Sequence, residues 1–175
     1  MASPGTYTGR HPLRAAFEAR DFDGVRNALS PDVVLHSPIT SSFRFEGRDE
    51  VAPLLESVRG VFTDLRYLHE FGDGDVRVLV FDARVGAQQI QGTDIMRLDE
   101  QGRVSEIRVF VRPLAGLTAF AAVLAPRLAR RRGKARAFAV ARMLGPVALM
   151  TRLGDVPVSR LVSGKSVRSG SAPRE

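Results

Sequence analysis

The chain has 175 residues, of which 44% are hydrophobic and 26% are charged, ordinary values for a globular protein with a core of normal size. It has no cysteine, which excludes disulfides, thiolate nucleophiles and cysteine-bound zinc. No segment approaches the roughly 20 apolar residues of a membrane span, and the N-terminus lacks the apolar core of a signal peptide. We therefore expect a soluble, cytoplasmic protein.

The net charge of +7 is unevenly distributed along the chain. Residues 127–175 hold 12 Lys and Arg against 2 Asp and Glu, a net charge of +10, so the preceding 126 residues have a net charge of −3. The basic character therefore belongs to the C-terminal segment. It does not by itself indicate that the whole protein binds nucleic acid.

The first half of the chain predicts helices around one short strand. Residues 1–9 are small and polar and are expected to be disordered. Apolar spacing then predicts a helix from His11 and a second helical region that reaches Leu29. The sequence DVVLHSP, residues 32–38, predicts a short strand. Six apolar side chains in residues 47–62 fall on one face of a long amphipathic helix: Val51, Leu54, Leu55, Val58, Val61 and Phe62.

After Thr63 the apolar period changes from that of a helix to that of a strand. Alternation predicts a β-rich second half with turns at 72–75 and 99–102, and its strands cover 64–71, 76–86, 88–98 and 103–113. Helices followed by an antiparallel meander indicate an α+β fold.

One carboxylate interrupts the apolar side of the strand over 88–98. Strand side chains alternate between two faces, so Asp94 shares a face with Ile90, Met96 and Leu98. A carboxylate in an apolar interior is costly unless it is protonated, hydrogen-bonded or paired. Asp94 is therefore the main candidate for a site, either as an acid that contacts a ligand or as a structural group bonded to a neighbouring element.

The order of these segments resembles a known superfamily over about residues 10–115. The sequences ARDFDGVRNALSPDVVLHSP, FEGRDEVAPLLESV and GTDIMRLDEQGRVSEIRVFVRP are similar to SnoaL-like members of the nuclear-transport-factor-two-like superfamily. The resemblance implies a cone: a curved mixed or antiparallel sheet wrapped around a long helix, enclosing an apolar pocket. The superfamily includes polyketide cyclases, ketosteroid isomerases, limonene-type epoxide hydrolases and members without catalytic activity.

The resemblance implies roles for a few residues. In the ketosteroid isomerase branch Asp94 would be a protonated acid that hydrogen-bonds an oxyanion. The general base of that branch would fall at Ser37, which cannot accept a proton at neutral pH, and its phenolic donor near Leu13, so the isomerase mechanism is disfavoured. Epoxide hydrolases use Arg-x-Asp where this chain has Asp82 and Arg84 in the reverse order. These two either line the pocket or, as the apolar opposite face favours, lie on the surface.

Tyr67 and His69 share the predicted inner face of their strand, and a histidine titrates near neutral pH. The candidate catalytic residues are therefore Asp94, Tyr67 and His69, and the candidate ligand-binding residues are His36, Ser37, Asp82, Arg84 and Met96. The three histidines are too scattered for a metal motif, and we expect neither metal nor cofactor. We expect a pocket that binds or transforms a small, largely apolar molecule of polyketide, steroid-like or terpenoid type; a non-catalytic binding or interaction protein is the alternative.

The C-terminal segment predicts a further helix over 116–131 and then a basic cluster, RLARRRGKAR. The sequence AFAVARMLGPVALMT, residues 137–151, holds one charge in fifteen residues. We expect this region to cap the cone or pack in a dimer; alternatively, residues 127–152 contact an anionic membrane or a partner. Nucleic-acid binding is disfavoured because only Phe138 could stack on bases.

The chain is thus divided into a disordered N-terminus, a cone domain and a basic helical extension with a flexible tail that ends in SGKSVRSGSAPRE: residues 1–9, 10–126 and 127–175. We also expect a homodimer that forms through the sheet.

Overall fold

A computed structural model describes residues 9–42, 44–130, 133, 138–139, 142–151 and 153. The expectations of disorder for residues 1–8 and 163–175 therefore concern parts of the chain outside this set, as does most of the basic cluster.

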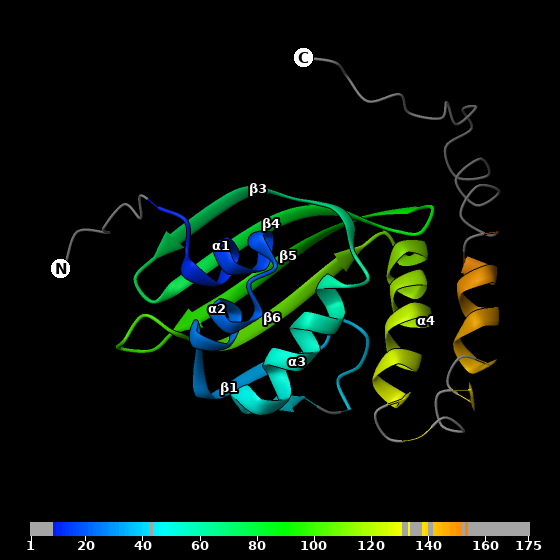
Figure 1. The fold of residues 1–175 in the computed structure, drawn as a ribbon. Helices are drawn as coiled ribbons and strands as arrows, with labels where there is room; N and C mark the ends of the chain where they lie inside the picture. The colour runs from blue at the N-terminus through cyan, green and yellow to red at the C-terminus, as the bar shows by residue number, and fades with distance from the viewer. Residues whose placement is uncertain are drawn as a thin grey trace, which may run out of the picture.

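The described chain forms short helices, a six-stranded sheet and a long final helix, which confirms the α+β prediction (Figure 1). A further short helix covers residues 142–151. The elements in chain order are α1 (Pro12–Ala19), α2 (Phe22–Asn27), β1 (Leu29–His36), β2 (Phe45–Glu46), α3 (Arg48–Arg59), β3 (Thr63–Asp73), β4 (Val76–Val85), β5 (Gln88–Leu98), β6 (Val104–Arg112) and α4 (Leu114–Arg130).

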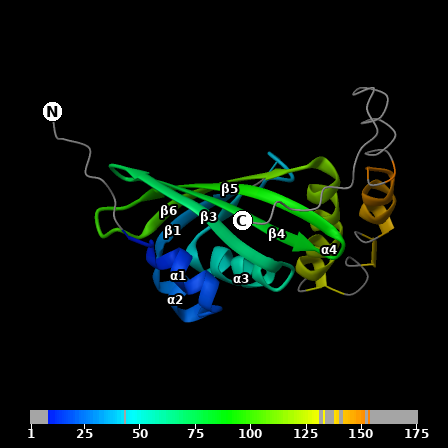
Figure 2. The ribbon, with the colours of Figure 1, turned by 90° about the horizontal axis from the view of Figure 1, so that it is seen from above.

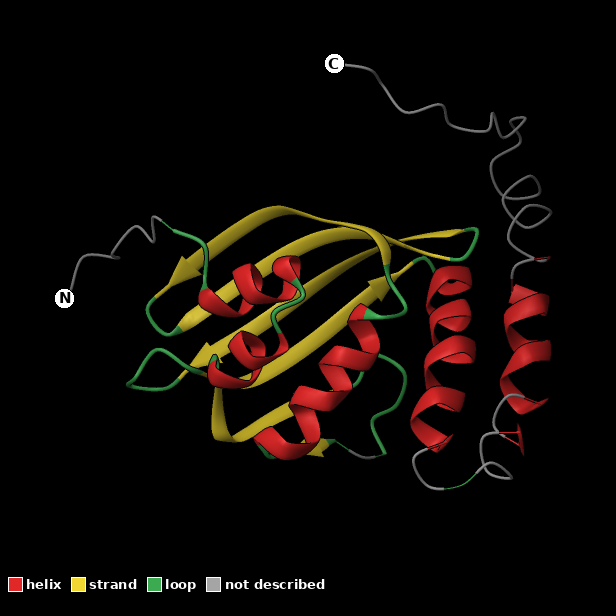
Figure 3. Cartoon of the chain, viewed as in Figure 1, coloured by secondary structure: helices red, strands yellow, loops and turns green. Residues whose placement is uncertain are grey.

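The sheet has the strand order β2-β1-β6-β5-β4-β3, and its pairs are antiparallel except for β1 with β6. It is curved, and α1, α2 and α3 lie against one face (Figures 2 and 3). The inner face carries most of the core, including Leu79, Phe81, Ile90, Met96, Val104 and Ile107, each at most 3% exposed. The curved sheet and the helix α3 packed inside it form the predicted cone.

The N-terminal helices begin at side chains that cap them. His11 Nδ1 accepts a hydrogen bond from the Leu13 amide at 3.1 Å, and Asp21 accepts one from the Gly24 amide at 2.9 Å. Leu29, expected in the second helical region, instead begins β1. Pro31 disfavours helical geometry at the residue before it, and the Leu29 side chain gains full burial in the sheet.

The helix α4 packs closely on the sheet at β5. A Cβ added at Gly116 would lie 2.5 Å from Ile90 Cγ2 and 3.1 Å from the Gln89 carbonyl oxygen, so this close approach requires glycine. The division expected at residue 126 falls inside α4, which continues to Arg130. No helix in the described part of the chain combines the length and apolarity needed to cross a bilayer.

Candidate ligand pocket

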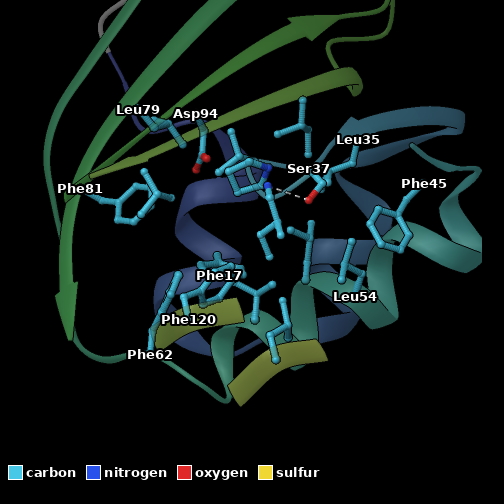
Figure 4. Close-up of a pocket in the computed structure, with 18 of the residues that line it drawn as sticks. Phe17, Leu35, Ser37, Phe45, Leu54, Phe62, Leu79, Phe81, Asp94 and Phe120 are labelled. Carbon is cyan, nitrogen blue, oxygen red and sulfur yellow. Dashed lines mark hydrogen bonds between the residues drawn. The ribbon is translucent and has the colours of Figure 1, made fainter. Parts of the chain in front are cut away.

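A cavity of about 260 Å³ lies between the inner face of the sheet and the helices α1, α3 and α4 (Figure 4). Its wall is formed by apolar side chains from every layer, such as Phe17, Leu54, Phe81, Ile107 and Phe120. Among the described residues that line it, four have polar side chains: Ser37, Thr40, Tyr67 and Asp94. The cavity is therefore an apolar chamber with very few polar groups.

Asp94 projects from β5 into this chamber. It pairs with Leu79 on β4 and Val109 on β6, and Met96 follows it on the same face. The residue is half-buried, and it lines the cavity. Within the described chain no side chain or backbone group hydrogen-bonds its carboxyl. Burial raises the pKa of Asp94 from 3.8 to about 7, so both protonation states are populated near neutral pH.

Tyr67 is the second ionisable group in the cavity wall. Its ring stands edge-on to Phe81, with 6.0 Å between centroids, and the Arg14 guanidinium lies 5.2 Å from the ring centroid. Arg14 is fixed in turn by an ion pair with Glu70 at 3.1 Å, whose side chain is 6% exposed. Burial, and then the negative charge of Asp94, raise the pKa of Tyr67 well above 10. The phenol therefore stays protonated.

Gly92, two residues before Asp94, makes room for an aromatic wall. It pairs with Phe81 on β4, and a Cβ at Gly92 would lie 2.1 Å from Phe81 Cζ. The Phe81 ring therefore lies over the glycine backbone and forms part of the cavity surface. A larger residue at position 92 would displace this ring.

The expected placement of His69 in the pocket is wrong. Between Tyr67 and His69 the pairing with β4 shifts from Phe81 to Val80, so β3 contains one extra residue at this point. The bulge reverses the alternation of faces. His69 is exposed, on the side of the sheet away from the cavity, where its ring stacks on Phe71 at 5.8 Å.

Asp82, Arg84 and His36 also lie outside the cavity. The first two alternate on β4 with the buried residues Phe81 and Ala83, so they point away from the core, and no ion pair between them is seen in the described structure. This outward position removes the epoxide hydrolase arrangement, which requires both side chains beside Asp94. His36 Nε2 instead lies 2.8 Å from Glu106 Oε1.

Of the remaining candidates, Ser37 and Met96 line the cavity. The Ser37 hydroxyl accepts a hydrogen bond from the Ile39 amide at 3.1 Å. Leu13, near which the resemblance implies the phenolic donor of the isomerase branch, is also in the wall and is 6% exposed.

Three polar residues in or beside the cavity wall were not predicted from the sequence. These are Thr40 in the wall, and Arg14 and Glu70, which form an ion pair in which Arg14 lies over the Tyr67 ring. The pair joins residues 56 positions apart, and no local pattern in the sequence signals it. Among the described residues, no group of three or more His, Asp or Glu side chains is placed to hold a metal ion.

The fold and the cavity place the protein in the nuclear-transport-factor-two-like class. The model of the SnoaL-like domain matches residues 12–107, and the chain belongs to this family. A search among curated proteins gives no match.

Two solved structures are similar in sequence as well as in fold. A steroid delta-isomerase from Pseudomonas aeruginosa is 35% identical, with a TM-score of 0.63 over 67% of this chain and 87% of that one. A bacterial protein with a cystatin-like fold from Silicibacter pomeroyi is 29% identical, with a TM-score of 0.63 over 69% and 88%. A putative ketosteroid isomerase from Kribbella flavida, 19% identical with a TM-score of 0.52 over 58% and 73%, shares the fold alone.

Proposed function

We propose that the protein binds a small, largely apolar molecule with a single carbonyl oxygen, and that Asp94 is the acid–base group that acts on it without a metal. The observation that carries this proposal is the Asp94 carboxyl, which has no hydrogen-bond partner among the described residues and lines a largely apolar chamber. Ligand pockets are typically apolar cavities of roughly 300–1,000 Å³ with a few polar groups that orient the ligand. The cavity of about 260 Å³ lies just below this range, and four of the described residues that line it have polar side chains.

The protonation states of the two ionisable groups define the chemistry. At neutral pH part of the Asp94 population carries a proton and can donate a hydrogen bond to a carbonyl, and the rest is a carboxylate that can accept a proton. Tyr67 remains a neutral hydroxyl at all moderate pH values. Asp94 as base and Tyr67 as donor to the developing oxyanion would support transfer of a proton from one carbon to another beside a ketone. The steroid delta-isomerase relative makes a steroid enone the first ligand to test.

Non-catalytic binding is the second candidate. Ser37 stands where the resemblance expects the general base, and Leu13 stands where it expects the phenolic donor. A pocket without these two groups can retain the ligand and lack turnover. In that case the protonated form of Asp94 acts only as an anchor for the ligand oxygen.

Both candidates are tested with a steroid 4-en-3-one as the binding probe and a steroid 5-en-3-one as the substrate. Calorimetry measures binding, and the absorbance of the conjugated product measures turnover. Asp94→Ala should weaken binding about tenfold to a hundredfold, because one buried hydrogen bond to a charged or strongly polar group is lost. Asp94→Asn keeps the shape and a donor but cannot titrate, so binding should become independent of pH and any turnover should disappear.

The matched control is Asp82→Asn, which changes the same functional group on the outer face and should leave both readouts unchanged. If protonated Asp94 is only an anchor, wild-type affinity falls above pH 7 and no product forms. If Asp94 is the base, turnover instead rises through pH 7, and Tyr67→Phe reduces it. Equal binding by wild type, Asp94→Ala and Asp82→Asn would contradict the role of Asp94.

A further inference from the structure

The short helix over 142–151 exposes apolar side chains on one side. Met143, Val147 and Met150 are 73%, 47% and 72% exposed, and their spacing of four and three residues places them on a single helical face. One turn after Val147, the Thr151 hydroxyl lies 2.6 Å from the Thr118 hydroxyl of α4. The helix is therefore held against α4 at Thr151, and Met143 and Met150 remain largely exposed.

This helix lies beyond α4 on the side away from the sheet in two perpendicular views (Figures 1 and 2). Leu153, 65% exposed, follows it, and Leu114 on α4 is also 65% exposed. Soluble proteins rarely expose so many large apolar side chains close together unless that surface binds a partner. We call the exposed apolar side chains of this segment the terminal face: Met143, Val147, Leu149, Met150 and Leu153.

The sequence segment that carries the terminal face has charges of one sign. Residues 127–153 contain eight Lys and Arg and no Asp or Glu. Arg130 and Arg142 are exposed, the latter at the start of the helix. Apolar side chains flanked by arginines are the composition of helices that lie in the interface of an anionic bilayer.

We propose that the terminal face docks on the surface of an anionic lipid bilayer, with its apolar side chains among the acyl chains and its arginines at the headgroup phosphates. The charge favours lipid over a second copy of the chain, because symmetric pairing would bring two segments of net charge +10 together. The apolar side chains favour lipid over nucleic acid, because contacts with nucleic-acid phosphates alone would leave the exposed methionines and leucines in water.

The test is flotation of the full chain with vesicles of phosphatidylcholine alone or mixed with phosphatidylglycerol. The protein should float with the anionic vesicles and remain below with the neutral ones, and added salt should weaken binding. Replacing Met143, Val147 and Met150 together by Ser should reduce the partition coefficient about a hundredfold, because three partly exposed apolar side chains no longer enter the bilayer. The matched control replaces Phe71 and Phe110, 58% and 56% exposed elsewhere on the molecule, by Ser and should bind as wild type does.

A second measurement separates docking from a folding defect. The chain has no tryptophan, so Val147→Trp introduces a single fluorescent reporter on the terminal face, and Phe71→Trp places one on the control surface. With anionic vesicles the emission of the Val147→Trp variant should shift to the blue, whereas that of the Phe71→Trp variant should not. The proposal is overturned if wild type does not float, if both Ser variants lose binding equally, or if the terminal face instead mediates self-association or binding to a single-stranded oligonucleotide in preference to vesicles.

Discussion

Two carboxylates on neighbouring strands of one sheet have opposite environments. Glu106 on β6 accepts hydrogen bonds at 2.8–2.9 Å from His36 and Arg108 and lies 3.6 Å from Arg97. Partial burial acts to raise the pKa of Glu106, but the hydrogen bond and charge of Arg108, together with His36, outweigh it and hold the pKa below its ordinary value. Asp94 on β5 is desolvated and has no compensating partner among the described residues, and its pKa rises to about 7.

The contrast separates a structural charge from one that is free to act. Glu106 is paired with cationic side chains, whereas the Asp94 carboxyl has no hydrogen-bond partner among the described residues, at a cost to stability. Groups with pKa values raised by burial inside a cavity are typical of functional sites. We therefore expect the free energy of unfolding to respond in opposite directions to pH, and differently to substitution, at the two residues. These responses can be measured without knowledge of the ligand.

The largest effect is expected from Asp94→Asn on stability at alkaline pH. Folded Asp94 keeps its proton up to about pH 7, whereas the unfolded chain releases it near pH 4. The native state then binds more protons between these values, so the free energy of unfolding falls as pH rises from 4 to 7 and is constant above. At pH 8 the Asn variant should be more stable than wild type by on the order of 2–4 kcal/mol.

Urea unfolding of both proteins from pH 4 to pH 8 measures this difference. Near pH 4 the two curves should almost coincide, because the wild-type carboxyl is then neutral in the folded state. A stability difference that does not change with pH would show that the Asp94 carboxyl is not desolvated. The other titrating groups, including His11, are common to both proteins and cancel in the comparison.

An intermediate effect is expected from Gly92→Ala, which alters the cavity wall beside Asp94. The new methyl group collides with the buried Phe81 ring, and overpacking of a core typically costs about 1–3 kcal/mol. The matched change Thr93→Ala, at the next position on the outer face, should alter stability by no more than about 0.5 kcal/mol. Thermal unfolding of the two variants makes the comparison; equal shifts would show that the Phe81 ring moves aside freely.

The inner position of Asp94 was predictable because the pairing of β5 with β4 is uninterrupted. It begins with the pair Gln88 and Val85 and ends with the pair Arg97 and Val76. Uninterrupted pairing preserves the alternation of faces. The same rule failed at His69 because β3 bulges after Tyr67, and the sequence there has no glycine or proline to mark it. Register irregularities depend on the fit to a neighbouring strand, which a single segment does not encode.

Helix spacing also predicted the helix over 116–131 without predicting what it packs against. Its apolar period was visible in the sequence, but the choice between capping the cone and packing in a dimer was open. In the structure Phe120, Leu124 and Leu128 of α4 line the cavity. That placement depends on the close approach at Gly116, a contact between distant segments that composition cannot reveal.

The smallest effect is expected from Glu106→Gln, the counterpart of the Asp94 variant on the outer face. Because the pKa of Glu106 is lowered on folding, its contribution is present above its ordinary pKa and is lost as pH falls through the lower folded value. Arg97 and Arg108 are each 57% exposed, so solvent screening limits the loss at pH 7 to about 1 kcal/mol or less. Salt should reduce it further, whereas the enclosed Asp94 should respond little. Urea unfolding of both variants at low and high salt therefore tests whether pairing or burial governs each carboxylate, and a Glu106 effect as large as that of Asp94 would remove the distinction between the two faces.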